Sequence, residues 1–560
     1  MKKLLVMLLA LTMVLSLFSA CGKKDSGSAE KPVAEEGEQP AEEGEEAAEP
    51  EQENINGLVL PITEEKAELS VLTVYESALI TNPNDIKGNA AMEERTNVHI
   101  NWQVCGQTEM LERFQVVLST GEYPDILIPA GTNVYPGGYE QGIADGVLVD
   151  MDPLTEYMPN YMLLVNSDPE VRKMAAYDDG KFHGIKTIQG TDTEIKGPGA
   201  VFGPTYRSDL LEKMGEELPT TIEGWHQLLI KCRDAGMTAP MTLESDGGTA
   251  LSLAWGVNTD WSTNYWQYDY STGTVTYSPL VPAFEDWLKT MRDWYAEDLI
   301  DKNFTAGAAI ITGDYSNIEN DQTMLFDIWF GFQNGTFLHD AGFVSNENVY
   351  MQGFPGVSLE EGGEVIKCVG DSPVGQELFV TTAVKDPVIA AKWLDYCFTQ
   401  ESADFRYYGI EGESYTIENG EKTYTDAILH PEGDLTPSDQ LGYYAMRTYG
   451  IGYSNQQAGD RLSIATSPNG RSAQIESIDL WASPEKSIHM PAGVALNAEE
   501  SELCNQYMTD IQTLVQEYMV KFIIGEDTTP YSEFVEKLKS YHIDECVACW
   551  QAAADRYNAR

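Results

Sequence analysis

The sequence predicts an α/β protein that contains parallel β-sheet. Strand and helix patterns alternate over residues 69–129, and this alternation favours a parallel sheet with helices packed on it. Hydrophobic residues make up 42% of the 560 residues and aromatic residues 10%. The roughly five hundred residues after the N-terminal tract can therefore bury two sizeable cores.

The predicted elements at the start of the folded region follow one another closely. Strand patterns cover residues 69–75, 98–104 and 125–129, and helical patterns cover residues 89–96 and 110–118. In open sheets of this kind, ligands bind beyond the carboxyl ends of the strands. This rule directs attention to Tyr75 and Glu76 after the first strand, and to Gly131 and Thr132 after the third.

Longer helical patterns fill much of the remaining chain. They cover residues 208–214, 222–235, 284–297, 388–399, 501–522, 532–541 and 543–557. Trp225, Trp287 and Trp393 lie in these helices among apolar neighbours, which favours packing in the core for each of them. Thr220 and Thr221 provide a cap before the second of these helices.

The first twenty-one residues have the pattern of an export signal. Two lysines precede a nearly unbroken apolar run of fourteen residues, Leu4 to Leu17. This run is shorter than the roughly twenty residues of a permanent membrane span, so we expect its removal after export. Ser19-Ala20-Cys21 resembles the lipobox of bacterial lipoproteins, which implies lipidation at Cys21 and tethering at the outer face of the cell membrane. An ordinary secreted protein with a cysteine at this position is the alternative.

Residues 22–56 form an acidic tract of Glu, Ala, Gly, Pro and Gln with almost no large apolar residue. Such a composition cannot bury enough apolar surface to fold, and its like charges extend it. It is therefore predicted to be a disordered spacer. An acidic tail that binds a basic partner is the alternative.

The charge of the chain limits its partners. A formal net charge of -54 excludes nucleic acid as the expected ligand, because Lys and Arg supply most of the affinity for phosphates. It also disfavours anionic ligands, though weakly at physiological salt. The favoured ligand is neutral or cationic. No later segment is apolar over eighteen residues, so no second membrane span is predicted.

The cysteines do not predict a disulfide framework or a metal site. Setting Cys21 aside leaves seven of the eight, so at least one is unpaired or intermolecular. Cys546 and Cys549 form the only CxxC, in a helical pattern without the preceding strand of a thioredoxin-type site, and core packing is favoured. No second CxxC or HxxxH completes a zinc site, and we expect no cofactor.

Ten stretches of the chain, taken in order, carry a resemblance to a known family. They are residues 92–98, 119–126, 145–154, 179–184, 206–215, 218–228, 322–330, 384–394, 408–415 and 541–557. In this order they resemble the landmarks of the family 1 extracellular solute-binding proteins, the carbohydrate-associated receptors of ABC importers. The last two stretches resemble the large lipoprotein branch of Gram-positive bacteria. The similarity covers nearly everything after the acidic tract.

The resemblance implies an α/β, two-lobed, periplasmic-binding-protein-like fold of type II. A hinge would join the lobes, and the ligand would be enclosed in the cleft between them. The first crossing between lobes is expected after residues 181–189, where Gly190 and residues 197–199 provide flexible and turn positions, and the second near residues 346–353. The expected division is a signal peptide at 1–20, a lipidated linker at 21–66, a first lobe at 67–189 and 349–435, and a second lobe at 190–348 and 436–560.

The implied ligand directs attention to aromatic residues, because sugars present apolar faces on which rings stack. Trp329 lies where the family has a stacking aromatic residue, in a strand where Asp327 replaces a small or apolar residue; a Trp that seals the lobe edge is the alternative. Trp255 lies where family members often place a second aromatic contact. Trp261 and Trp266 lie in a polar aromatic stretch that either reaches the cleft or forms a surface hairpin.

Four further residues are candidates for the ligand site. Tyr75 and Glu76 qualify as hydroxyl-binding groups by their position after the first strand. Arg207 lies where the family commonly has an Arg before a helix that faces the cleft, with an ion pair to Asp209 as the structural alternative. Trp481 lies near a predicted late crossing between the lobes.

The sequence favours a receptor over an enzyme. It contains no GxSxG, HExxH or P-loop lysine, and among its 89 Asp and Glu residues no pair stands out as that of a glycosidase. We expect a monomeric, lipid-anchored protein that binds a carbohydrate, in the simplest case a neutral oligosaccharide, and delivers it to the permease subunits of an ABC transporter. The alternatives are a receptor for a peptide or other non-sugar ligand, and a surface glycoside hydrolase or polysaccharide-binding lipoprotein.

Overall fold

The computed structural model describes most of the chain after the acidic tract. It covers residues 53–560 except 108, 130–134, 197–201, 244–250, 261–263, 307–314, 331–333, 341, 368–371, 448–449 and 482–486. The predicted signal peptide, Cys21 and most of the acidic tract therefore lie outside the described residues, as do Gly131, Thr132 and residues 197–199. Among the helices that are described, none is both long and apolar enough to cross a membrane.

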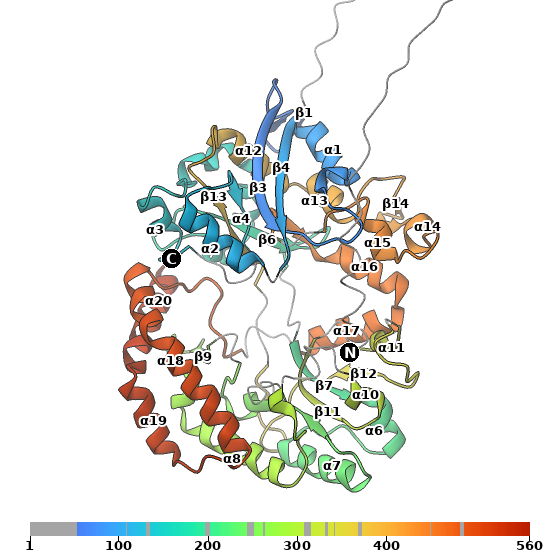
Figure 1. Ribbon diagram of the computed structural model, residues 1–560, viewed down its shortest axis with the longest axis vertical. Coiled ribbons are helices and arrows are strands. Elements are labelled where there is room, and N and C mark those ends of the chain that lie inside the picture. Colours follow the sequence, from blue (N-terminus) through green and yellow to red (C-terminus); the bar gives the residue numbers. More distant parts are fainter. Residues whose placement is uncertain are drawn as a thin grey trace, which may run out of the picture. The chain divides into compact units, whose positions relative to one another are not determined.

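The first of two main sheets has six strands in the order β16-β6-β13-β5-β3-β4 (Figure 1). Its strands are β3 (Ala67–Val74), β4 (Val98–Cys105), β5 (Ile126–Leu127), β6 (Ile185–Gly190), β13 (Val374–Val380) and β16 (Tyr453–Asn455). β3 pairs in parallel with both β4 and β5, and α1 (Lys87–Thr96) and α2 (Met110–Thr120) connect these strands. The parallel unit predicted from the sequence is confirmed.

Both faces of this sheet are covered, which explains why two successive apolar residues of β3 are both buried. Val71 and Leu72 are successive residues of β3 and point to opposite faces, yet both are fully buried. Val71 belongs to a core with α4 (Pro159–Val165) and α12 (Pro387–Cys397), which includes Trp393 as predicted. Leu72 packs with residues of α2 and α3 (Tyr139–Ala144).

The second sheet has four strands in the order β12-β7-β11-β8. They are β7 (Phe202–Arg207), β8 (Met241–Thr242), β11 (Leu325–Phe330) and β12 (Met351–Gly353). Its core joins residues of α6 (Ser208–Met214), α7 (Ile222–Asp234) and α8 (Pro282–Ala296) with the β9 (Trp266–Asp269) and β10 (Thr274–Tyr277) hairpin. Trp225 and Trp287 are fully buried in this core, as predicted.

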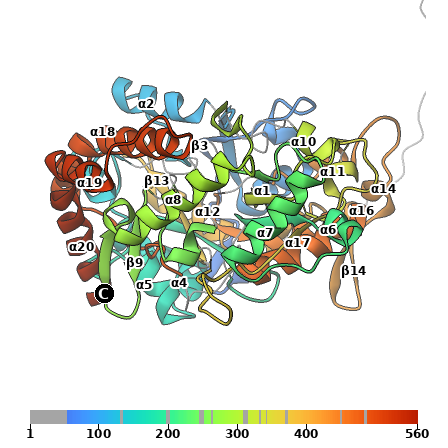
Figure 2. The same cartoon turned by 90° about the horizontal axis from the view of Figure 1, so that it is seen from below.

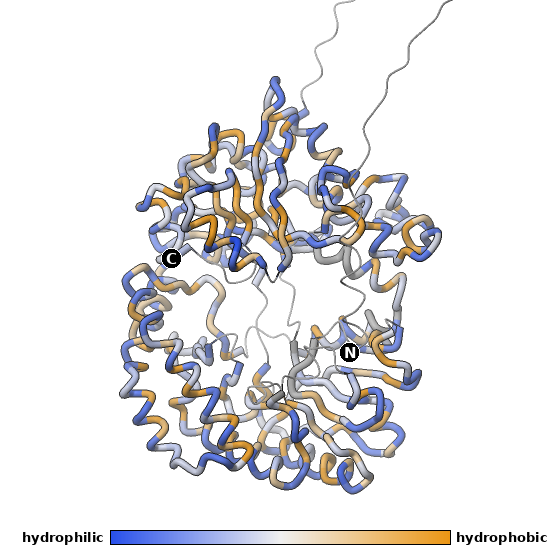
Figure 3. The backbone as a smooth tube through the Cα atoms, viewed as in Figure 1, coloured by the Kyte–Doolittle hydropathy of each residue, from blue (hydrophilic) through white to orange (hydrophobic). Residues whose placement is uncertain are grey.

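The C-terminal helices belong to the same core. α18 (Ala498–Ile523), α19 (Tyr531–Ser540) and α20 (Ile543–Ala559) lie side by side in both views (Figures 1 and 2) and contribute buried residues to it. Hydrophobic and hydrophilic stretches alternate along them (Figure 3), as expected for helices with one buried face. The predicted helices in this part of the chain are confirmed to within a few residues at each end.

Shorter elements complete the described chain. They are β1 (Glu53–Ile55), β2 (Leu58–Leu60), α5 (Pro169–Ala175), α10 (Ser316–Glu319), α11 (Phe337–Asp340), α13 (Gln400–Tyr407), β14 (Tyr415–Glu418), β15 (Glu421–Tyr424), α14 (Asp426–Leu429), α15 (Pro437–Gly442), α16 (Gln456–Thr466) and α17 (Pro468–Trp481).

The described strands and helices show three passages of the chain between the two sheets. The first passage follows β6, where the sequence places it. The second lies after Gly353 and not at residues 346–353, because β12 pairs with β7 of the four-stranded sheet. A third follows Asn455, since β16 pairs with β6 while α17 packs against β7 and β12. β16 therefore extends the six-stranded sheet beyond the expected limit at residue 435.

A buried carboxylate ties α12 to α4. Asp395 in α12 is 0% exposed and accepts hydrogen bonds from the Tyr161 backbone N–H at 2.9 Å and from Asn160 Nδ2 at 2.7 Å. Its two oxygens thus satisfy two polar groups of α4 that have no access to water. Burial raises the pKa of Asp395 to about 6, although these hydrogen bonds act in the opposite direction.

We predict that Asp395→Ala destabilises the protein by roughly 2–4 kcal/mol, because it leaves buried donors of α4 without an acceptor. Urea unfolding measures this loss. Asp386→Ala is the matched control in the same helix, since Asp386 caps α12 from an exposed position and its loss should cost about 1 kcal/mol. Equal losses in the two variants would contradict the role of Asp395.

The raised pKa of Asp395 adds a pH dependence. A carboxyl whose folded pKa exceeds its unfolded value stabilises the fold fully below the unfolded pKa, and this contribution is lost as pH rises through about 6. The difference in unfolding free energy between wild type and D395A should therefore widen as pH is lowered from 7 to 5. A constant or shrinking difference would show that the pKa is not raised.

Candidate functional site

A cavity of about 730 Å³ opens at the carboxyl ends of the parallel strands β3, β4 and β5. Its volume lies within the range of small-molecule sites. The lining residues that follow these strands, or lie in β13 and around α15, are Thr73, Val74, Tyr75, Glu76, Ser77, Ala78, Leu79, Gln107, Ile128, Pro129, Gln376, Ser438, Asp439, Gly442, Ala445 and Arg447.

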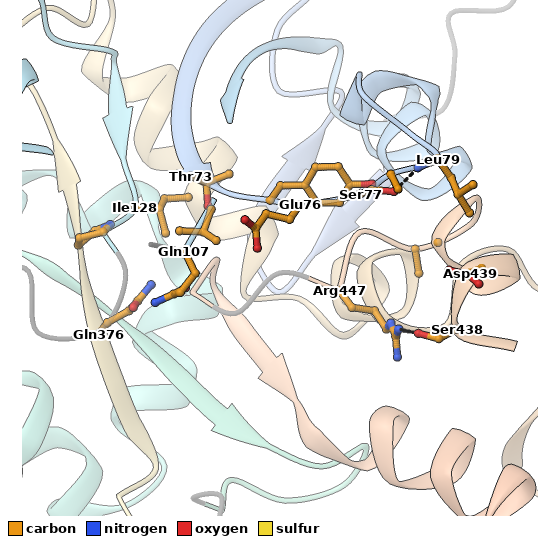
Figure 4. Close-up of a pocket in the computed structure, with 16 residues that line it drawn as sticks. Thr73, Glu76, Ser77, Leu79, Gln107, Ile128, Gln376, Ser438, Asp439 and Arg447 are labelled. Atoms are coloured by element: carbon orange, nitrogen blue, oxygen red, sulfur yellow. Dashed lines mark hydrogen bonds between the residues drawn. The ribbon is translucent and has the colours of Figure 1, made fainter. Parts of the chain in front are cut away.

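Sheet pairing explains why residues far apart in sequence meet here. β3 and β4 are in register up to Val74 opposite Cys105, so the residues that follow both strands emerge at one edge. β13 runs antiparallel to β5, which brings Gln376 near its beginning to the same edge. In Figure 4, Glu76, Gln107 and Gln376 project toward a common space from these different segments.

Polar groups of both charge signs line the cavity. Among the described lining residues, Glu76 and Asp439 supply carboxylates, Arg447 a guanidinium, and Gln107 and Gln376 amides. Partial burial raises the pKa of Tyr75, so its hydroxyl stays protonated and can donate a hydrogen bond. The wall thus offers acceptors, donors and apolar surface, the chemistry that a polyhydroxylated solute requires.

The helix α15 positions two of these groups. Asp439 completes a capping box with Thr436, accepting from the Thr436 N–H at 3.0 Å and from its hydroxyl at 2.7 Å. These hydrogen bonds lower the pKa of Asp439, so the carboxylate is charged at neutral pH. Arg447 donates to the hydroxyl of Ser438, which directs the guanidinium along the same wall (Figure 4).

A second cavity of about 470 Å³ borders the same loop. Residues 75–78 line both spaces, and Ile80, Thr81 and Val104 complete the second one. The loop after β3 therefore contributes residues to both cavities. Tyr75 and Glu76, the two residues selected from the sequence by the strand-end rule, lie in the walls of both cavities.

Arg207 is a structural residue, in agreement with the alternative considered for it. Its side chain is 0% exposed and binds Asp209 through two nitrogens at 2.6 and 2.8 Å. It also pairs with Asp321 at 2.7 Å and donates to the Ile318 carbonyl at 2.9 Å. Because these donors bind groups of α6, of α10 and of the turn after α10, and the side chain is fully buried, Arg207 has the structural ion pair considered as the alternative and is corrected as a ligand-binding residue.

Two of the candidate tryptophans are also core residues, so their assignment to the ligand site is corrected. Trp266 in β9 is 2% exposed and packs against Tyr277 and Trp550. Trp481 at the end of α17 is 1% exposed, and its Nε1 donates to the Phe354 carbonyl at 3.1 Å. Trp255 is partly buried in the short 3₁₀ helix Leu251–Trp255 and packs against the second core.

The remaining candidates from the sequence are still predictions. The backbones of Trp329 and Asp327 lie in β11, but their side chains are outside the described part, and Trp261 lies outside it altogether.

Sequence reasoning missed five polar residues of the cavity lining, Gln107, Gln376, Ser438, Asp439 and Arg447. Gln107 follows the second predicted strand and was within reach of the strand-end rule, whereas the residues around α15 reach the site only through tertiary packing.

The described side chains include no group of three or more His, Cys, Asp or Glu residues suited to a metal ion. The six described cysteines are free, and Cys546 of the CxxC is buried in the core. The fold and the cavity are those expected of a solute-binding protein, with the candidate site between polar side chains at the end of a parallel sheet.

Comparison with known proteins identifies the family. Residues 84–404 match the family described as bacterial extracellular solute-binding protein. This match covers more than half of the chain, and the protein belongs to that family. Over 98% of its length the chain is 19% identical to the fructooligosaccharide ABC transporter substrate-binding protein FusA of Streptococcus pneumoniae serotype 4, of which 97% is covered.

Solved structures show the same fold. An extracellular solute-binding protein of Bifidobacterium longum subsp. infantis matches with a TM-score of 0.70 at 15% identity, covering 88% of this chain and 98% of that one. An HMO-binding, ABC-transporter-associated solute-binding protein of Bifidobacterium longum infantis matches with a TM-score of 0.69 at 16% identity, covering 88% and 99%. The α/β, two-lobed type II fold predicted from the sequence is thereby confirmed.

The structural role of Trp481 can be tested by truncation. A Cβ added to Gly203 or Gly353 would lie 2.3 or 2.8 Å from the indole, so the ring packs directly on the backbones of β7 and β12. We predict that Trp481→Ala costs roughly 3–5 kcal/mol of unfolding free energy, as for other buried aromatic residues. Trp255→Ala, at a partly buried position, should cost clearly less. Unchanged stability of W481A in thermal or urea unfolding would return Trp481 to the list of binding candidates.

Proposed function

We propose that this protein captures a neutral oligosaccharide outside the cell and delivers it to the permease subunits of an ABC importer. The observation that carries the proposal is the cavity at the strand ends, where carboxylates, amides, a phenol and apolar side chains converge. Sugars need this mixture, because their hydroxyls exchange hydrogen bonds with polar groups while their CH faces pack on apolar surface.

One feature supports a neutral cargo, and another supports an oligosaccharide. The described cavity residues include two carboxylates and one guanidinium, and the whole chain has a formal net charge of -54, so an anionic glycan would meet repulsion. The similar proteins named above bind fructooligosaccharide and HMO according to their descriptions, which supports an oligosaccharide as the class of ligand.

The N-terminal sequence supports a site of action at the outer face of the cell membrane. Lipidation of Cys21 would anchor the mature protein, and the acidic tract would act as a tether between the membrane and the binding body. The proposed binding set comprises Tyr75 and Glu76 with the newly found cavity residues. Trp329, Asp327 and Trp255 remain proposed contacts from the resemblance, and Trp261 remains one because of its place in a polar aromatic stretch. The proposed protein is a monomer and performs no catalysis.

A thermal-shift screen tests the class of ligand. We expect stabilisation by one or more of kestose, maltotriose, cellotriose and xylotriose, since a ligand at a hundred times its dissociation constant adds about 2.7 kcal/mol to stability. Trigalacturonate is the charged control and should give a smaller shift. Mass spectrometry of the recovered sugar should show it intact; shortened products would favour the glycoside hydrolase, and stabilisation by peptides alone would favour a non-sugar receptor.

Trp329 provides a second test. If its ring stacks on the sugar, Trp329→Ala should abolish the shift given by the stabilising trisaccharide and leave the melting temperature of the unliganded protein within about 2 °C of wild type, since a large drop is the mark of a lost core residue. A large drop in the unliganded protein would identify Trp329 as a core residue. Trp266→Ala is the matched control, because that ring is buried in the core and its loss should lower the melting temperature.

A further inference from the structure

The carboxylate of Glu76 occupies space that only a glycine leaves open. Glu76 lies just after β3 and Gly106 just after β4. The Tyr75 N–H donates to the Cys105 carbonyl at 3.0 Å, which continues the parallel pairing past the end of β3. A Cβ built on Gly106 would lie 2.1 Å from Glu76 Oε1 and 3.0 Å from its Cδ. Any larger residue at position 106 would therefore collide with this carboxylate.

The backbone itself does not require glycine at position 106. The φ angle of Gly106 is not in the left-handed region, so an alanine could adopt the same backbone conformation. The segment is also held in place, because the Gly106 carbonyl accepts from the backbone N–H groups of Glu109 and Met110, each at 3.1 Å, at the start of α2. The backbone of Gly106 is thus held in place beside Glu76. The carboxylate of Glu76 fits there because Gly106 has no side chain.

A second polar side chain of the cavity rests on a glycine in the same way. A Cβ on Gly450 would lie 1.8 Å from Gln376 Nε2. Gly450 has a φ of +105°, so its backbone demands glycine in any case. Gly442 in the cavity wall differs from both, because an added Cβ there meets no atom within 4 Å and its φ is not left-handed.

We propose that Gly106 is a positioning residue that seats the Glu76 carboxylate as the hydrogen-bond acceptor for the ligand. This role rests on the function proposed above, in which the Glu76 carboxylate accepts hydrogen bonds from sugar hydroxyls and so contributes to the affinity for the ligand. An ionised carboxylate accepts hydrogen bonds through both oxygens and donates none, so it selects hydroxyl or amino groups. Seating it against a rigid wall before the ligand arrives reduces the ordering cost of binding.

The first test is structural and needs no ligand. Gly106→Ala should move the Glu76 carboxylate away from its position beside residue 106 while the fold is retained, as a crystal structure of the unliganded variant would show. A Glu76 carboxylate that keeps its position in G106A would overturn the seating role. The crystal structure tests whether Gly106 positions Glu76 and needs no bound sugar. Failure of every trisaccharide to stabilise the wild type would overturn the proposed function and leave this structural result unaffected.

The second test is calorimetric, with the panel trisaccharide that wild type binds most tightly. We expect G106A and Glu76→Gln each to weaken binding about tenfold or more. Ser119→Ala, an exposed change in α2 outside the cavity lining, should leave the affinity within about twofold of wild type. Glu76→Asp withdraws the carboxylate from the wall, so adding G106A to E76D should cause no further loss. Wild-type affinity in G106A, or full additivity of G106A and E76D, would overturn the proposal.

Discussion

The parallel pairing of β3 with β4 and β5 is the constraint on which the site depends. Because the three strands run in the same direction, the loops that follow them leave the sheet at one edge, and Tyr75, Gln107 and Pro129 reach the same cavity. The pairing in turn depends on burial of β3 on both faces, where Val71 and Leu72 belong to different cores. The solute site is therefore a consequence of how the sheet is covered.

Local sequence patterns predicted much of the fold because its helices and its first sheet unit have clear periodicity. The helix at Ser208–Met214 agrees with its predicted range, and Thr221 caps the next helix by accepting from the Gly224 N–H at 3.1 Å. The position of β16 could not be predicted, since three residues pair with β6 across more than two hundred residues of chain. Long-range pairing of short strands leaves almost no local signal.

The lining of the candidate cavity was predicted only where it follows from strand order. Tyr75 and Glu76 were selected because the carboxyl end of a strand can be recognised in the sequence, whereas Arg447 and Asp439 reach the cavity through the packing of α15. Tryptophan proved a poor guide. Trp266 and Trp481 are both buried, although the local sequence around them does not indicate this. The sequence alone does not distinguish an indole that packs on glycine backbones, as Trp481 does, from one that stacks on a sugar.

Asp439 serves two purposes at once, as a cap of α15 and as a charged group of the cavity wall. The hydrogen bonds that begin the helix also hold its proton affinity down. As pH falls, an ordinary carboxyl therefore takes up a proton before that of Asp439 does. The start of a helix thus keeps this part of the cavity wall charged in a medium that would neutralise other carboxylates.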